Sequence, residues 1–305
     1  MTRTFAVVAA ALGSTLFFAL ATALKHRSAE QTPDARRRGL RPLLHFLVAT
    51  ARHPLWLCGI AADVGGVTLQ VTALHIGALA AVQPLLVTSI VVSLLFNHRI
   101  AGTRVEAREI RGGIVLVVAI GGFLLVSGAS SPAVTGPVQP ADVAPAVSVG
   151  VVAVLLALVS VLLSRRLPHG RGAALLGVTT GVTFACTAAL IKSCSNIVLA
   201  HGPVALLTSW QPYVLVAAGL AGLVLTQLAF QAGPLRASLP ATASVDPLVS
   251  IALGVLIYDE HLRTGPVAIT AELACLTVMC AAAAYLSRLT PQSPDTPRHC
   301  PVPAR

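Results

Sequence analysis

Charged residues are scarce in this chain of 305 residues: only 10% are Asp, Glu, Lys or Arg, against about 25% in a typical soluble domain. Lysine is nearly absent, since Lys25 and Lys192 are the only two, and there are 11 acidic residues. This scarcity argues against a soluble globular protein. Apolar sequence takes the place of charge, because 55% of the residues are hydrophobic and they gather in long runs.

Motifs of catalysis and metal binding are also missing. The sequence contains no Gly-x-Ser-x-Gly elbow, no His-Glu-x-x-His pair and no Asp-rich run that would hold a magnesium diphosphate. Its six cysteines form no Cys-x-x-Cys pair, and four of them lie in hydrophobic runs, where packing is the simplest role. We therefore expect no enzymatic activity and no cofactor, and the sequence specifies no metal.

Nine hydrophobic runs are long enough to cross a bilayer as helices. About 20 apolar residues in an α-helix rise about 30 Å, the thickness of the hydrocarbon core. The runs are continuously apolar, whereas strands of a membrane barrel would alternate. The predicted fold is therefore all-α, a polytopic membrane helix bundle with about nine transmembrane helices. The predicted spans are 5–24, 54–74, 76–96, 113–129, 146–164, 173–191, 212–230, 237–258 and 266–287.

The basic residues indicate how the chain is oriented. With the amino terminus outside, 18 of the 21 Lys and Arg residues fall on the inner side, and Arg3, Lys192 and Arg263 fall on the outer side. This is the positive-inside bias, so the net charge of +10 signals topology and anionic lipid rather than nucleic acid. We expect a multi-pass protein of the cell membrane with a cytoplasmic carboxyl terminus. The first span is predicted to stay uncleaved, because cleavage would export the basic segment 25–53.

A faint internal repeat divides the chain. Residues 73–84 match residues 229–240 at a constant offset of 156, with five of twelve positions identical. Phe17 and Lys25 align with Phe184 and Lys192 at an offset of 167. Four helices, one linking helix and four further helices place the second set upside down, as in the inverted repeats of many secondary transporters. The predicted organisation is a first membrane repeat (1–129), an outer linker with linking helix and inner loop (130–172), a second membrane repeat (173–288) and a disordered cytoplasmic tail (289–305).

Three carboxylates fall inside predicted spans, where ionisable groups are costly unless they face water or a partner. Asp63 and Asp246 each lie nine residues into a span, about 14 Å from the inner boundary and close to the midplane. Either could bind a cation or proton, or make a structural contact between helices. Pro247 follows Asp246 and predicts a kink that frees a backbone carbonyl, which Asp246 could also cap. Glu272 lies nearer the outer boundary, where it could also snorkel or pair with Arg263.

Neutral polar side chains extend the candidate site. Gln70, Gln83 and Gln227 could line a polar path through the bundle, although interhelical hydrogen bonds explain each of them equally well. Pro84 directly follows Gln83 and predicts a second kink. The segment 40–52 is too short to cross the bilayer, and its flanking arginines favour either an interfacial or an inserted helix.

Three stretches carry a resemblance to a known family: residues 13–25, residues 77–87, and Gly254-Val-Leu-Ile-Tyr-Asp-Glu-His-Leu262. They resemble the drug/metabolite transporter superfamily, in particular its EamA-like and NIPA-like members, over essentially all nine spans. Typical members have ten helices and a Gly-Glu pair near the end of the penultimate helix. Here Glu260 matches the Glu and Asp259 replaces the Gly. For Glu260 we expect a structural role, in which it fixes the end of its span or pairs with Arg263. The chain is also one helix short, as are the NIPA-type magnesium transporters.

The resemblance implies a secondary active transporter of a small molecule or ion that works by alternating access. Two alternatives stay open: a NIPA-like divalent-cation (magnesium) transporter, and a lipid-handling or accessory membrane protein that transports nothing. The candidate substrate or ion-binding residues are Asp63, Asp246, Gln70, Gln83, Gln227 and Glu272. The expected partners are the lipid bilayer and the substrate, with a homodimer left open. No nucleic acid is expected.

Overall fold

The computed structural model describes residues 2–31, 54–101, 105–129, 143–164, 166–232 and 235–289. Within these ranges the regular structure is helical, which confirms the all-α prediction. The helices are α1 (Thr2–Gln31), α3 (Pro54–Ile76), α4 (Leu79–Leu86), α5 (Ser89–Ala101), α6 (Ala107–Ser127), α7 (Val143–Ser164), α8 (His169–His201), α9 (Pro203–Thr208), α10 (Gln211–Ala232), α11 (Leu235–Tyr258) and α12 (Pro266–Leu289).

The described residues contain eight helical segments that are long and apolar enough to cross a membrane. The seventh of the nine predicted spans, 212–230, is α10, whose apolar stretch Gln211–Thr226 is shorter than the others. Large apolar side chains are exposed along α6, α7, α10 and α12, as expected of helices that face lipid. The predicted polytopic membrane bundle is therefore confirmed, with eight long spans plus α10.

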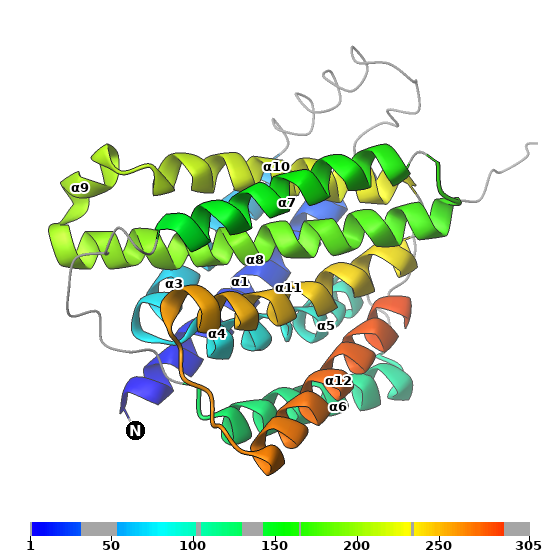
Figure 1. Cartoon of the computed structure of the whole chain (residues 1–305). Coiled ribbons are helices and arrows are strands. Elements are labelled where there is room, and N and C mark those ends of the chain that lie inside the picture. The colour runs from blue at the N-terminus through cyan, green and yellow to red at the C-terminus, as the bar shows by residue number, and fades with distance from the viewer. Residues whose placement is uncertain are drawn as a thin grey trace, which may run out of the picture.

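The same pair of helix contacts occurs twice. α1 packs along α3 and α8 packs along α10, and in Figure 1 α1 and α8 run in opposite directions. A Cβ added at Gly65 of α3 would lie 2.8 Å from the ring of Phe17 on α1, and a Cβ at Gly222 of α10 would lie 2.7 Å from the ring of Phe184 on α8. Phe17 and Phe184 are the residues that the sequence repeat aligns. The residues aligned by the sequence repeat therefore make equivalent contacts in the two helix pairs, whose first helices, α1 and α8, run in opposite directions.

The helices α8 and α11 approach each other closely. A Cβ added at Gly177 would lie 2.5 Å from the backbone oxygen of Ser238, and one at Gly181 would lie 3.0 Å from the backbone oxygen of Thr242. The Thr242 hydroxyl donates a hydrogen bond to the Gly177 carbonyl at 2.9 Å. Small residues spaced by four allow backbones in membranes to approach in this way. This contact fixes α11, which carries Asp246, against α8.

We expect the Gly177→Val variant to be severely destabilised. The new side chain would collide with backbone on α11, and overpacking of this kind costs about 1–3 kcal/mol even where neighbouring side chains can shift. A melting curve of the purified protein in detergent checks this result. The matched control is Gly219→Ala on α10, where an added Cβ has no neighbour within 4 Å. Equal melting temperatures for the two variants would contradict the α8–α11 contact.

The helices α6 and α12 lie side by side at the lower edge of the bundle in Figure 1. Gly112 of α6 faces α12, because a Cβ there would lie 2.8 Å from the Leu286 side chain. Leu286 belongs to one core cluster that also takes in residues of α1, α3, α4, α5, α8 and α11. The core is therefore shared by helices from both ends of the sequence.

Some predicted features lie outside the described residues. These are the segment 40–52, residues 130–142 of the predicted linker region, and the tail from residue 290 onward. Residues 196–201 belong to α8, and α9 follows after Gly202, whose φ of 83° turns the chain.

Candidate functional site

Asp63 and Asp246 both lie near the middle of long helices, α3 and α11. Asp63 is half-buried in α3, and Asp246 is half-buried in α11, where it accepts a hydrogen bond of 3.4 Å from the Ser250 hydroxyl. The backbone nitrogen of Asp246 lies close to Gly181 of α8, since a Cβ at Gly181 would approach it to 3.1 Å. Asp246 therefore sits beside the tight α8–α11 contact, and among the described residues it has one long hydrogen bond, to a neutral hydroxyl.

Two of the other predicted residues are buried with incomplete hydrogen bonding. Gln83 in α4 is 3% exposed and Glu272 in α12 is 8% exposed. Within the described part of the chain, Nε2 of Gln83 and Oε1 of Glu272 have no hydrogen-bond partner. Buried polar atoms nearly always have one, so each exception calls for an explanation. Gln70 is buried in α3, and Gln227 lies in α10.

The helix that carries Gln83 is interrupted just beyond it. Pro84 has no N–H group to donate, and α4 ends at Leu86. The backbone nitrogens of Val87 and Thr88 then bond to the carbonyls three residues before them, at 3.2 and 3.1 Å, before α5 begins. At Pro247, by contrast, α11 continues as one helix, so the kink there stays a prediction.

Several electrostatic contacts meet at Glu260, two residues after the end of α11. Its carboxylate accepts hydrogen bonds from the backbone N–H groups of Leu79, at 2.6 Å, and Ala80, at 2.9 Å. These are the first two residues of α4, whose N–H groups have no partner within their own helix. A negative charge at this end also interacts favourably with the helix dipole. Glu260, 3% exposed, therefore caps α4 from a position 180 residues away.

The backbone conformation around Glu260 positions its carboxylate at the start of α4. The Glu260 N–H donates to the Gly254 carbonyl at 3.0 Å. Any side chain at Gly254 would collide with the carboxylate, because a Cβ there would lie 2.4 Å from Oε2 of Glu260. Asp259 has a φ of 51°, in the left-handed region, which Asp tolerates better than most residues.

Lys192 of α8 supplies the opposite charge. Its Nζ forms an ion pair with Oε1 of Glu260 and donates to the Gly77 carbonyl at 3.2 Å. The ammonium also lies 5.1 Å from the centre of the Tyr258 ring, within range of a cation–π interaction. Lys192 is only 3% exposed, so the pair is shielded from solvent. The result is a buried charge cluster, which we call the Glu260 cluster: Glu260, Lys192, Tyr258, Gly77 and the first turn of α4.

Further hydrogen bonds at the same end join early helices to late ones. Nδ1 of His75 lies 2.8 Å from the Ser195 hydroxyl, which links α3 to α8. The Arg263 N–H donates to the Ser127 carbonyl at 2.9 Å, which links the α11–α12 connection to the end of α6. Together with the Glu260 cluster, these contacts tie one end of the bundle together.

The sequence pointed to Glu260 only in part. It suggested that Glu260 fixes a helix terminus or pairs with Arg263; the structure shows a cap on α4, a distant helix, and a pair with Lys192. One signal was available for Lys192, since it is one of only two lysines and stands at the aligned position of the repeat. The described residues contain no group of three His, Cys, Asp or Glu side chains placed to hold a metal ion.

The fold and these buried charges define the class of protein: a multi-pass, all-α membrane protein. The chain is 33% identical over 254 residues to a protein of Corynebacterium glutamicum named "Uncharacterized protein Cgl0250/cg0304", and the match covers 83% of this chain and 84% of the relative. It belongs to the same family as that protein. No family model matches the chain, and no solved structure matches it.

Proposed function

We propose that this protein is a secondary active transporter of a small molecule or ion, of the drug/metabolite transporter type, that works by alternating access. The observation that carries the proposal is the doubled packing of α1 on α3 and of α8 on α10, with Phe17 against Gly65 and Phe184 against Gly222. Two similar helix groups that run in opposite directions can exchange conformations, and this exchange opens a central site to each side in turn.

Asp246 is the proposed coupling residue, and Asp63 is its counterpart on α3. A carboxylate near the midplane couples transport when it binds a proton or cation more tightly in one facing state than in the other. The unpartnered polar atoms of Gln83 and Glu272 support a polar path, since a substrate would supply the hydrogen bonds that the described residues do not. Gln70 and Gln227 are assigned to the same path.

The contacts around Glu260 support the family resemblance. Glu260 stands where the superfamily has the Glu of its Gly-Glu pair, and Asp259 stands where it has the Gly. The left-handed φ of 51° at Asp259 is a conformation that favours glycine, so the exchange keeps the backbone geometry. In the proposed cycle the Glu260 cluster closes one end of the bundle, which is the outer end in the predicted orientation, and its contacts to α4 break when that end opens.

A transport assay in proteoliposomes tests the proposal. Proteoliposomes that contain the protein are loaded with a pH-sensitive dye. Amines, amino acids, sugars and Mg²⁺ are then added outside, one compound at a time. We expect saturable uptake of at least one organic compound together with proton movement. Saturable Mg²⁺ entry without an organic substrate would replace the proposal with the NIPA-like alternative. No saturable flux of any compound would favour an accessory or lipid-handling protein and overturn the proposal.

A further inference from the structure

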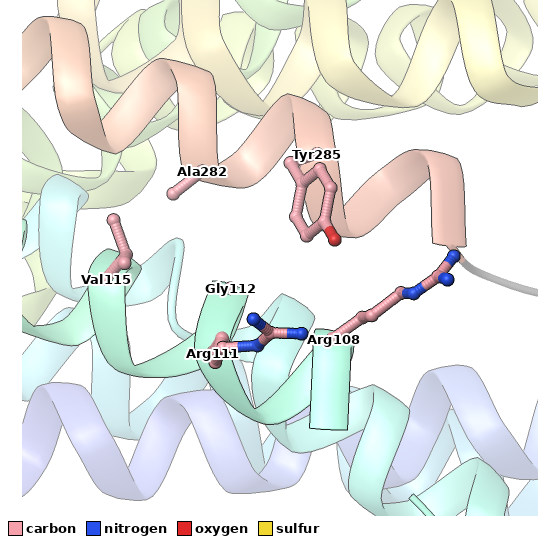
Figure 2. Close-up of a pocket in the computed structure, with 6 residues that line it drawn as sticks. All are labelled: Arg108, Arg111, Gly112, Val115, Ala282 and Tyr285. Carbon is pink, nitrogen blue, oxygen red and sulfur yellow. The ribbon is translucent and has the colours of Figure 1, made fainter. Parts of the chain in front are cut away.

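A second polar feature lies at the opposite end of the bundle from Glu260. A cavity of about 460 Å³ opens between α6 and α12, lined by Arg108, Arg111, Gly112, Val115, Ala282 and Tyr285 (Figure 2). Arg108 is in the first turn of α6, and Tyr285 is near the end of α12. Glu260 precedes the start of α12, so the length of that helix separates the cavity from the Glu260 cluster.

The mouth of this cavity carries positive charge that nearby carboxylates do not neutralise. Arg108 and Arg111 are both exposed, and the Nε of Arg111 bonds only to the Ala107 carbonyl, at 3.3 Å. No carboxylate among the described residues forms an ion pair with either arginine. Glu109, the nearest acid on the buried side of α6, is engaged elsewhere: it bonds to His98 and to the backbone nitrogen of Glu106, at 2.9 and 2.8 Å.

The remaining lining residues are mainly apolar. Val115 is 46% exposed and the Tyr285 ring is 44% exposed, while Gly112 lets α12 approach α6 at the floor. Figure 2 shows Tyr285 reaching from α12 toward α6, with its hydroxyl turned toward the level of the two arginines. Ile114 and Val118, also exposed, continue the apolar surface along α6 away from Arg111. The cavity thus combines two arginines and a tyrosine hydroxyl at its mouth with an exposed apolar surface along α6.

We propose that this cavity binds an anionic phospholipid. The two guanidinium groups and the Tyr285 hydroxyl suit the phosphodiester and charged headgroup, because Arg binds phosphate oxygens through paired N–H donors. The acyl chain lies along Val115 and Ala282, at the depth where tyrosine marks the membrane interface. Basic pockets between transmembrane helices bind such headgroups, whereas a water-soluble phosphate would make no use of the apolar surface.

Native mass spectrometry of the full-length protein tests this site. The protein is titrated with phosphatidylglycerol and with phosphatidylcholine, and separately with inorganic phosphate. We expect the wild type to prefer phosphatidylglycerol, and the Arg108→Gln/Arg111→Gln variant to bind it about tenfold more weakly. Tyr285→Phe keeps the ring and should weaken binding less. This single change also tests the site if the double variant fails to fold.

The matched control is Arg166→Gln/Arg171→Gln, which removes two exposed arginines near the α7–α8 connection, at the same end of the bundle. The control should keep the lipid preference of the wild type. An equal loss in both double variants would show that general charge, and not this cavity, attracts the lipid, and would overturn the proposal. Binding of inorganic phosphate that displaces phosphatidylglycerol from the wild type would overturn the lipid assignment.

Discussion

Replacement of Glu260 by Ala is expected to lower the free energy of unfolding by about 3–5 kcal/mol, the usual cost of breaking a buried ion pair by removing one partner. The loss has two physical parts. Lys192, 3% exposed, loses its carboxylate partner in a site shielded from solvent, although the Gly77 carbonyl and the Tyr258 ring remain beside it. The N–H groups of Leu79 and Ala80 lose their acceptor at the start of α4. Thermal unfolding of the purified protein in detergent measures the effect.

Two further variants separate these parts. Asp259→Asn removes a neighbouring, exposed acid and keeps a residue that tolerates the left-handed backbone, so its melting temperature should match the wild type. The double variant Lys192→Met/Glu260→Gln removes both charges of this pair and keeps an acceptor for α4. It should be more stable than either single change, because the uncompensated charge is gone. A double variant no better than Glu260→Ala would refute the ion pair as the source of stability.

The Asp246→Asn variant is expected to abolish coupled flux while leaving the amount and melting temperature of the protein unchanged. Asn has nearly the shape of Asp, and the one hydrogen bond described for Asp246, from Ser250 at 3.4 Å, can be kept. The change removes the ability to bind and release a proton or cation, which is the property that coupling requires. Uptake measured in the proteoliposome assay, with the substrate found there, checks the result.

The design of this experiment distinguishes transport from folding. Asp259→Asn is again the matched control, since it removes an acid outside the α11 helix and should transport normally. Asp63→Asn should reduce flux in the same assay if α3 carries the counterpart of Asp246. Unaltered flux in Asp246→Asn would show that Asp246 is not the coupling residue, even if the protein is a transporter.

Hydropathy predicted most of the fold because the bilayer leaves few choices. A run such as 266–287 must form a helix once it is in lipid, and α12 extends it by only two residues, to Leu289. A disturbance of the helix near Pro84 was expected, because proline donates no backbone hydrogen bond and its ring crowds the preceding turn. The helix α4 ends two residues later, at Leu86. Features that depend on local chemistry and on the membrane were therefore accessible from the sequence.

Contacts between distant helices were not accessible in the same way. The ion pair joins Lys192 to Glu260 over 68 residues, and the cap joins Glu260 to Ala80 over 180. From the sequence, Arg263 was the natural partner for Glu260, since it is three residues away in the same connection. Lys192 is the partner instead, because the packing of α8 against α11 brings Lys192 to the end of α11 and buries both charges.

The order of synthesis bears on the ion pair, because Lys192 is made 68 residues before Glu260. Lys192 enters the membrane with α8, when the segment with its carboxylate partner has not yet been synthesised. An isolated ammonium is costly below the headgroups, so α8 should rest with Lys192 at the surface until Glu260 emerges and neutralises it. Final docking of α4 and α8 would then wait for nearly the whole chain, and nascent chains halted before residue 260 should remain loosely assembled and open to proteases.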